Sequence, residues 1–287
     1  MNNLAVKTNK DRLVKMAVSA EVNHPSASRG YRTDFDGKPR IGLGMSGVKY
    51  NVALGDLTYG MENEEHVEPG LTISNIDKAE GGALAVLGCI GNEVKLTSGD
   101  AKGAIGRISG KHGGFIVHFK QEDKENVIPG DKVLVKAWGT GLKIEGFEET
   151  VRANKIDPEL LEKMGIEVKD GKLVVPVASE YPAYIMGSGY GMWPVTIDYD
   201  IQTTCPEVFD ELDLKNIRFG DVVCLHDQLN WYGRGYYEGA VTIGIVVHGW
   251  SKSAGHGPGI TTILSSKDGT IVPKMDSDAN IAKYLGD

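Results

Sequence analysis

Short apolar runs alternate with polar turns along most of this chain. The runs are rich in β-branched residues and are mostly bounded by glycine, aspartate or proline, which is the pattern of β-strands. We expect strands at residues 15–22, 48–54, 83–91, 114–120, 131–139, 172–178, 221–227, 240–249 and 259–265. The pattern therefore predicts a mainly β protein.

Helix signals are few by comparison. The clearest lies in PELLEKM, where Asp157 is placed as the N-cap, Pro158 takes the first helical position and Gly165 follows the end. Residues 206–212 and 280–285 are predicted to form two further short helices. So few helices cannot alternate with so many strands, which disfavours a parallel α/β fold.

The turns divide the predicted strands into two groups. Between about residues 82 and 143, strands recur at short intervals between glycine-rich turns, which predicts a small antiparallel β-barrel. We place a domain boundary near residue 150. The N-terminal β domain, residues 1–150, includes the barrel, and residues 151–287 form a second β-rich (α+β) domain with a few short helices.

Glycine is the unusual component of the composition. The chain has 38 glycines in 287 residues, where an average protein has about 7%. They follow no period, so we expect them to serve turns and bulges that need positive φ. The net charge of −8 disfavours binding to nucleic acid or to an anionic membrane, because both need a basic surface.

Cysteine use and hydropathy indicate the compartment. The three cysteines, Cys89, Cys205 and Cys224, are widely spaced and form no CxxC pair, which argues against a disulfide framework or a cysteine-rich zinc site. The first fifteen residues carry charge where a signal peptide needs an apolar core. The longest apolar run, residues 83–90, is too short to cross a bilayer. We expect a cytoplasmic protein.

Two short motifs offer metal ligands. In EHVEPG, an extended backbone would direct His66 and Glu68 to the same side, and a histidine with a carboxylate is half of a metal site. The competing interpretation is an acidic, solvated loop. In GHGPG, His256 is a third candidate ligand, although a rigid turn explains that motif equally well.

The most polar part of the chain, residues 226–259, surrounds one good strand. Its side chains alternate, with Val241, Ile243, Ile245 and Val247 predicted on one face and Thr242, Gly244, Val246 and His248 on the other. If the strands at 221–227, 240–249 and 259–265 form a meander, the loops at 228–239 and 249–259 lie at opposite ends, roughly 20 Å apart. The first loop provides Asp227 and Glu238 as candidate proton-transfer groups. Arg234 beside them is either a fork for a carboxylate or phosphate, or a structural ion-pair partner.

Two further segments have a chemical and a structural interpretation. Residues 99–114 gather Lys102, Arg107, Lys111 and His112 in glycine-rich sequence, which suits an anion but also suits a barrel hairpin. Residues 187–200 end in Asp198 and Asp200, which are either a second source of carboxylates or the solvated edge of a strand.

Seven motifs together resemble a known family. They are YNVALGD (50–56), HVEPG (66–70), GDAKG (99–103), KHGG (111–114), MGSG (186–189), YGRG (232–235) and GHGPG (255–259). The chain resembles the bacterial family of unknown function DUF4438 from about residue 31 to residue 265. The resemblance implies a mainly β protein with a small barrel like those of translation factors and a β-rich C-terminal part. It assigns no reaction.

Two functions follow as hypotheses. The first is a metal-assisted hydrolase or lyase that acts on a small polar metabolite such as an amide, with one divalent ion on His66, Glu68 and His256 and with Asp227, Arg234 and Glu238 as catalytic residues. The second is a non-catalytic protein that binds a small anion. A role on RNA is disfavoured by the charge. The expected partners are a small-molecule ligand and further copies of the chain.

Overall fold

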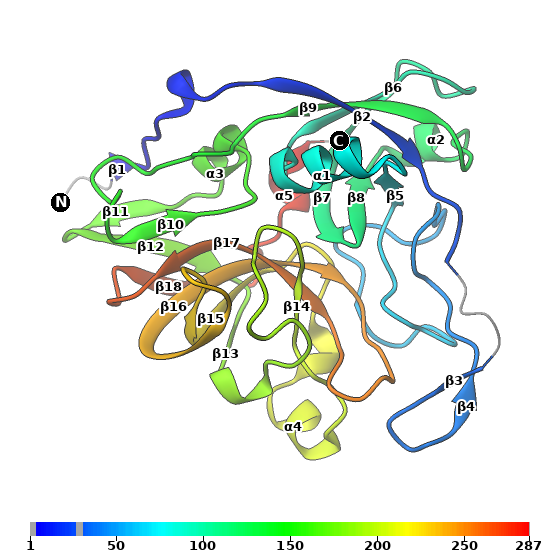
Figure 1. Cartoon of the computed structure of the whole chain (residues 1–287). Helices are drawn as coiled ribbons and strands as arrows, with labels where there is room; N and C mark the ends of the chain where they lie inside the picture. Colours follow the sequence, from blue (N-terminus) through cyan, green and yellow to red (C-terminus); the bar gives the residue numbers. More distant parts are fainter. Residues whose placement is uncertain (1–3, 27–30, 287) are drawn as a thin grey trace.

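The computed structural model describes residues 4–26 and 31–286. Within these residues the chain forms a closed barrel, a six-stranded sheet, a four-stranded sheet and a two-stranded ribbon (Figure 1). The helices are short and lie at the periphery of the sheets. The protein is mainly β, as the apolar pattern predicts.

The barrel is antiparallel and closes in the order β2, β5, β8, β7, β6, β9. Its strands are β2 (Met16–Val22), β5 (Leu71–Ser74), β6 (Glu93–Leu96), β7 (Ile105–His112), β8 (Gly114–His118) and β9 (Lys132–Ala137). Two of them, β2 and β5, precede the predicted range of residues 82–143. The reason is closure, because β2 pairs with both β5 and β9 and joins strands far apart in the sequence.

Two predicted strands are wrong. Residues 83–91 belong mostly to helix α1 (Lys78–Leu87), whose N-cap Asp77 accepts hydrogen bonds from the amides of Ala79 and Glu80. An apolar run of this length has no distinguishing period, so the cap decides the structure. Residues 48–54 form a loop that touches β5 through one bridge between Val48 and Leu71.

The six-stranded sheet contains the predicted meander. Its path is β10 (Val151–Ala153), β17 (Gly259–Ser266), β16 (Gly235–His248), β15 (Val222–Leu229) and β13 (Ser179–Tyr181), and β14 (Tyr199–Asp200) adds to β17. The predicted alternation along β16 is confirmed. Ile243 and Ile245 lie in the large core shared with the barrel, whereas Val246 lies in a second core on the opposite face.

The remaining sheet joins the chain's two ends. Its order is β1 (Leu4–Ala5), β11 (Glu167–Lys169), β12 (Lys172–Val177) and β18 (Ile271–Met275), while β3 (Arg32–Thr33) and β4 (Pro39–Arg40) form the ribbon. The other helices are α2 (Gln121–Lys124), α3 (Pro158–Lys163), α4 (Pro206–Glu211), α5 (Ala282–Leu285), η1 (Lys10–Arg12), η2 (Ala183–Ile185) and η3 (Leu214–Asn216). The three predicted helices are confirmed, and Asp157 caps α3. No helix among the described residues has the length and apolarity needed to cross a membrane.

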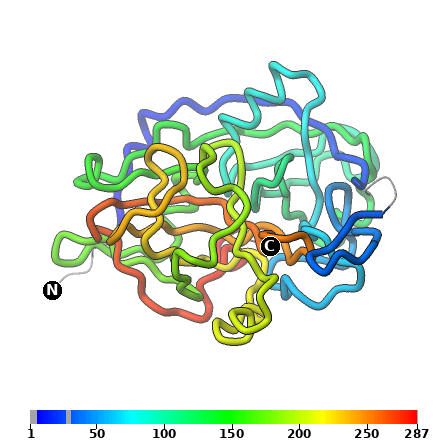
Figure 2. The backbone as a smooth tube through the Cα atoms, turned by 60° about the horizontal axis from the view of Figure 1, so that its bottom comes forward, coloured from blue at the N-terminus to red at the C-terminus, as the bar shows by residue number. Residues whose placement is uncertain are grey.

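The barrel packs directly against the six-stranded sheet, and this contact positions the candidate site. A Cβ on Gly110 of β7 would stand 2.5 Å from Val247 of β16, so the two strands approach closely only because residue 110 is glycine. The loop between β16 and β17 lies beside residues 31–70 (Figure 2), where the amide of Phe35 donates to the carbonyl of Lys252. Three distant parts of the sequence therefore meet.

Candidate functional site

Four histidines converge where these three parts meet. The ring centroid of His66 lies 5.3 Å from that of His112, 4.8 Å from that of His248 and 4.9 Å from that of His256. The rings of His112 and His248 are 4.2 Å apart. Four of the seven histidines of the chain thus form one cluster.

Each histidine comes from a different structural element. His112 ends β7 of the barrel, and His248 ends β16 of the large sheet. His256 lies in the loop between β16 and β17, and His66 lies in the loop before β5 with a φ of 49°. A left-handed φ is costly for a histidine, so surrounding contacts hold His66 there rather than local preference.

Two buried aspartates complete the cluster. Oδ2 of Asp198 lies 2.6 Å from Nε2 of His248. Asp200 reaches His248 with Oδ1, at 3.4 Å, and His256 with Oδ2, at 2.9 Å. Burial alone would lower the pKa of His248, but the two aspartates raise it well above its ordinary value. The two aspartates therefore stabilise a positive charge within the cluster.

Register explains how Asp200 and His248 meet across an intervening strand. In the sheet, Gly259 of β17 pairs with Asp200 of β14 on one side and with His248 of β16 on the other. A Cβ on Gly259 would stand 2.0 Å from Nε2 of His248. Because residue 259 has no side chain, the side chains of its two neighbours can lean over it and meet.

The outer nitrogens of three histidines face acceptors. Nδ1 of His112 lies 2.7 Å from Oε1 of Glu68, Nδ1 of His248 lies 3.0 Å from the carbonyl of Gly249, and Nδ1 of His66 lies 2.9 Å from Oε1 of Glu65. A carboxylate or carbonyl can only accept, so Nδ1 of His112 and Nδ1 of His248 carry a proton. This leaves Nε2 of His112 for a metal, the arrangement typical of metal-ligating histidines. Nε2 of His248 shares a proton with Oδ2 of Asp198, 2.6 Å away, and a bound ion would replace that proton.

The two glutamates are held as anions by a further layer of donors. Arg40 and Ser251 bind Glu65, whereas Thr72 and Lys49 bind Glu68. Burial would raise the pKa of Glu68, but His112 and Lys49 hold it at about 2. His66 and Arg40 likewise hold the pKa of Glu65 at about 2 against burial. Both glutamates therefore stay charged at neutral pH and fix their histidine rings.

The cluster opens into a pocket of about 310 Å³, a volume suited to a small metabolite. Its lining includes five of the six cluster residues, all except His248, together with Lys111, which is 4% exposed. Nζ of Lys111 donates to the carbonyl of Thr196 at 2.6 Å, which leaves two of its three N–H groups for another partner. The pocket thus combines candidate metal ligands with one ammonium group.

The structure gathers only part of the predicted site. His66, Glu68 and His256 come together, although Glu68 contacts His112 rather than standing among the inward-facing atoms. Asp227 and Glu238 lie elsewhere: Oδ1 of Asp227 accepts from the amide of Gly239 beside a bulge in β15, and Glu238 is exposed. The structure does not bring these two carboxylates to the cluster.

Arg234 is buried beneath the segment that carries the aspartates. Its guanidinium donates to the carbonyls of Ile197 and Asp198 and to that of Gly189 at 3.4 Å, and it lies over the ring of Tyr199. Neither Asp227 nor Glu238 is its partner in these contacts. In this position Arg234 orients the main chain around Asp198.

Four of the six cluster residues were not among the predicted ligands. The sequence places His112 in a basic hairpin and His248 in a strand, and it leaves Asp198 and Asp200 as either a second source of carboxylates or a solvated strand edge. The two aspartates are instead 5% and 4% exposed. The usable signal was the glycine-rich sequence around each of them, because close packing of loops needs glycine.

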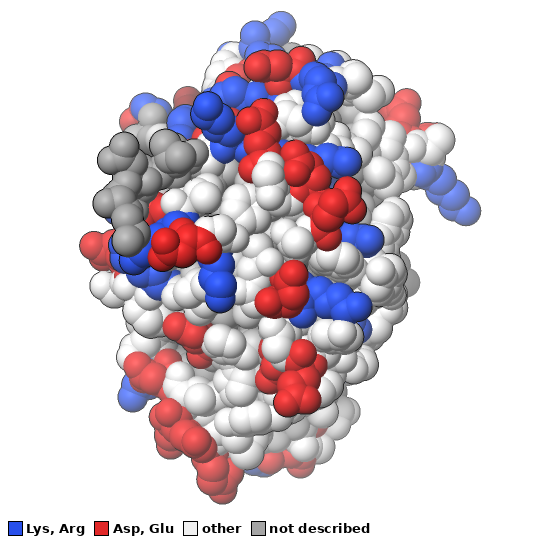
Figure 3. Space-filling model, turned by 90° about the vertical axis from the view of Figure 1, so that its left-hand side faces the viewer, with Lys and Arg blue, Asp and Glu red and all other residues white. Residues whose placement is uncertain are grey.

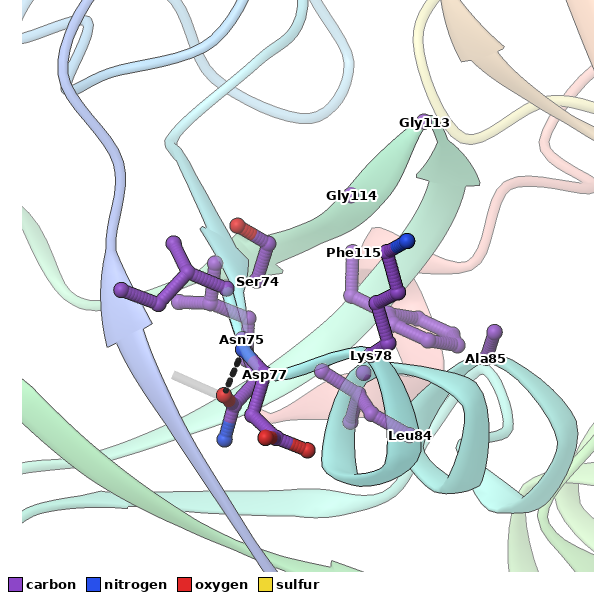
Figure 4. A pocket seen from close by; sticks show the side chains of 12 residues that line it. Ser74, Asn75, Asp77, Lys78, Leu84, Ala85, Gly113, Gly114 and Phe115 are labelled. Atoms are coloured by element: carbon purple, nitrogen blue, oxygen red, sulfur yellow. Dashed lines mark hydrogen bonds between the residues drawn. The ribbon is translucent and has the colours of Figure 1, made fainter.

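A second cavity lies on the other side of the β7–β8 turn. It has a volume of about 260 Å³ and is formed by β5, the start of β8 and helix α1 (Figure 4). The amide of Asp77 donates to the side chain of Asn75 there, and Asp77 itself caps α1. Its lining contains no histidine, so the first pocket is the chemically richer of the two.

Fold and site together define a class: a mainly β protein with a closed barrel and a buried histidine–aspartate cluster between the barrel and a large sheet. The N-terminal model of DUF4438, a domain of unknown function, matches residues 31–162, and its C-terminal model matches residues 163–285. The chain belongs to this family. A solved structure described as the crystal structure of TM1086 is 42% identical and covers 99% of this chain and 100% of its own, with a TM-score of 0.93. No curated protein matches the chain.

Proposed function

We propose that this protein is a metal-dependent hydrolase or lyase that acts on a small polar metabolite. The carrying observation is the convergence of His66, His112 and His248, which present ring nitrogens within 4.8 Å of one another beside the buried carboxylates of Asp198 and Asp200. Imidazole nitrogen and carboxylate oxygen, without thiolate, suit zinc and other divalent first-row metals. The histidines and the two aspartates would hold the ion.

The ion would supply an activated water and a polarised substrate carbonyl. The chain's own residues supply the rest. Asp198 and Asp200 are the carboxylates that line the pocket and would hold the ion, whereas Asp227 and Glu238, first considered for proton transfer, lie away from it. Glu65 and Glu68 keep the histidine rings in one orientation. Arg234 holds the main chain of Asp198 in place.

Lys111 supports a substrate with an anionic group. It is the cation that lines the pocket, and with two N–H groups to spare it would bind a carboxylate or phosphate oxygen. The same feature favours the second candidate function, a protein that binds a small anion without transforming it. The two candidates differ in whether product forms.

Surface charge supports a small-molecule partner rather than nucleic acid. The net charge is −8, and on the face in Figure 3 acidic and basic side chains are interspersed, with acidic ones prevailing toward the lower end. Nucleic-acid binding needs a continuous basic stripe. A cytoplasmic location remains a proposal. Self-association is a second proposal, and measurements of the oligomeric state would test it.

The test is hydrolysis by the chelated and the reloaded protein. The full chain is stripped with a chelator, reloaded with Zn²⁺, Mn²⁺ or Co²⁺, and assayed on small amides and esters with and without a carboxylate. We expect turnover only after reloading, its loss in His66→Ala and His112→Ala, and its retention in His226→Ala, a histidine outside the cluster. Turnover that survives chelation would refute metal catalysis. Metal binding without turnover would favour the anion-binding function.

A further inference from the structure

Five of the six cluster residues divide into two overlapping half-sites, and the sixth, His112, forms a further set with His66 and His248. His66, Asp200 and His256 present ligand atoms within 4.8 Å of one another, and so do Asp198, Asp200 and His248. His256 and Asp198 share no such set, although Asp200 belongs to both of theirs. The ligand atoms therefore spread beyond the shell of a single ion.

The two oxygens of Asp200 face different half-sites. Oδ1 lies 3.4 Å from Nε2 of His248. Oδ2 lies 2.9 Å from Nδ1 of His256 and 3.6 Å from Nε2 of His66. A carboxylate with one oxygen toward each of two ligand sets has the geometry of a bridge between two cations.

The distances in the first half-site suit one ion. Nε2 of His66 and Nδ1 of His256 are 3.0 Å apart, which closes a triangle with Oδ2 of Asp200. An ion with ligands at about 2.1 Å places neighbouring ligand atoms roughly 3.0–3.4 Å apart. The triangle therefore needs little rearrangement to bind a cation.

We propose that the cluster binds two divalent cations bridged by Asp200. One lies among His66, His256 and Oδ2 of Asp200, and the other lies among His248, Asp198 and Oδ1 of Asp200, with His112 beside His248. This inference rests on the proposed function and deepens it. A pair of cations about 3.5–4 Å apart clamps both the attacking and the leaving oxygen of a hydrolysed ester, amide or phosphoester.

The first test is the number of ions bound per chain. Full-length protein is stripped with a chelator, dialysed against Zn²⁺ or Mn²⁺, and analysed by mass spectrometry for metal and protein. We expect two ions per chain in the wild type and one in His256→Ala. The control is His226→Ala, because His226, Glu180 and Cys224 form a separate group able to hold a metal. It should retain both ions.

The second test reads the coupling between the two ions directly in the wild type. Electron paramagnetic resonance of the Mn²⁺-loaded wild type should show the exchange coupling of a carboxylate-bridged pair, and Asp200→Asn should lose it. Saturation at one ion, uncoupled Mn²⁺, or loss of an ion in His226→Ala instead of His256→Ala would overturn the two-ion centre. A chain that binds no ion would refute the proposed function as well. Two coupled ions without turnover would refute only the proposed reaction.

Discussion

Nδ1 of His112 lies 2.7 Å from Oε1 of Glu68, and both residues are held at the contact between the barrel and its surrounding loops. Glu68 is 2% exposed and receives donors from Thr72 and the amide of Ser46. The carboxylate thus keeps one ring nitrogen protonated and directs the other toward the cluster. In the proposed metal site Glu68 would therefore act through His112 and not by direct ligation.

Glu68→Gln should weaken metal binding without abolishing it. The amide can still accept a hydrogen bond from His112, but it lacks the negative charge that makes the ring a better ligand. We expect the dissociation constant for Zn²⁺ to rise about 10–100-fold, measured by competition with a chromophoric chelator. Glu62→Gln, an exposed residue of the same loop, is the control. Equal affinities in the two variants would contradict the role of Glu68.

Gly259→Ala should reduce the number of metal ions bound per chain. Its methyl group would stand 2.0 Å from Nε2 of His248 and 2.4 Å from Oδ2 of Asp198, so those atoms must separate. Metal analysis after reloading should find fewer ions than in the wild type. Gly82→Ala is the control, because a Cβ there meets nothing within 4 Å. Full metal content in Gly259→Ala would show that these atoms are not ligands.

Arg234→Lys and Arg234→Ala should both lower thermal stability. Lysine lacks the planar fork with which Arg234 reaches the carbonyls of Ile197 and Asp198 from two nitrogens. Alanine leaves these buried carbonyl groups without donors, at a cost of about 1–3 kcal/mol each. Melting curves should rank the alanine variant below the lysine variant. Arg152→Lys is the control, since Arg152 donates to the carbonyl of Trp231 at an exposed position. An unchanged melting temperature with weakened ligand binding would instead make Arg234 a ligand-binding residue.

Lys111→Met should leave metal content unchanged and remove the preference for anionic substrates. For a substrate with a carboxylate we expect KM to rise tenfold or more, equivalent to about 1.4 kcal/mol of lost binding, with little change for its neutral analogue. Lys102→Met, at an exposed position, is the control. A uniform loss of activity on both substrates would indicate that Lys111 supports the fold rather than the substrate.

Lys155 should make the free energy of unfolding rise as the pH rises above 8. Burial lowers its pKa to about 8, although its ammonium donates to the carbonyls of Ala85 and Gly88 at the end of α1. Between pH 8 and about 10.4, the ordinary value for lysine, the unfolded chain binds more protons than the folded one, so the contribution of Lys155 to stability rises with pH. Lys155→Met should remove that rise in denaturant unfolding measured at pH 7 and pH 10. Parallel curves for the two proteins would refute the lowered pKa.

Local sequence was sufficient to predict a strand or helix where the apolar pattern and the residues that end the element agreed. The alternation along residues 240–249 predicted which side chains of β16 face the large core, and the order Asp157, Pro158, Gly165 predicted helix α3. The meander predicted that the loops at 228–239 and 249–259 lie at opposite ends of this strand. The register confirms it, because His226 pairs with Val241 toward one end of β16 and Gly259 pairs with His248 at the other.

Tertiary structure decided the closure of the barrel and the composition of the site. Strands β2 and β5 join the barrel through pairings with distant strands, which no local pattern encodes. The candidate ligands His66, His112, Asp200 and His248 look like loop, hairpin and strand residues when taken one by one. They meet because β7 packs on β16 and because Gly259 leaves space between Asp200 and His248. The sequence by itself determined the mainly β class, the short helices and the acidic surface, since these depend on neighbouring residues and on composition. Which polar groups share a site depends on long-range packing, and only the folded chain decides it.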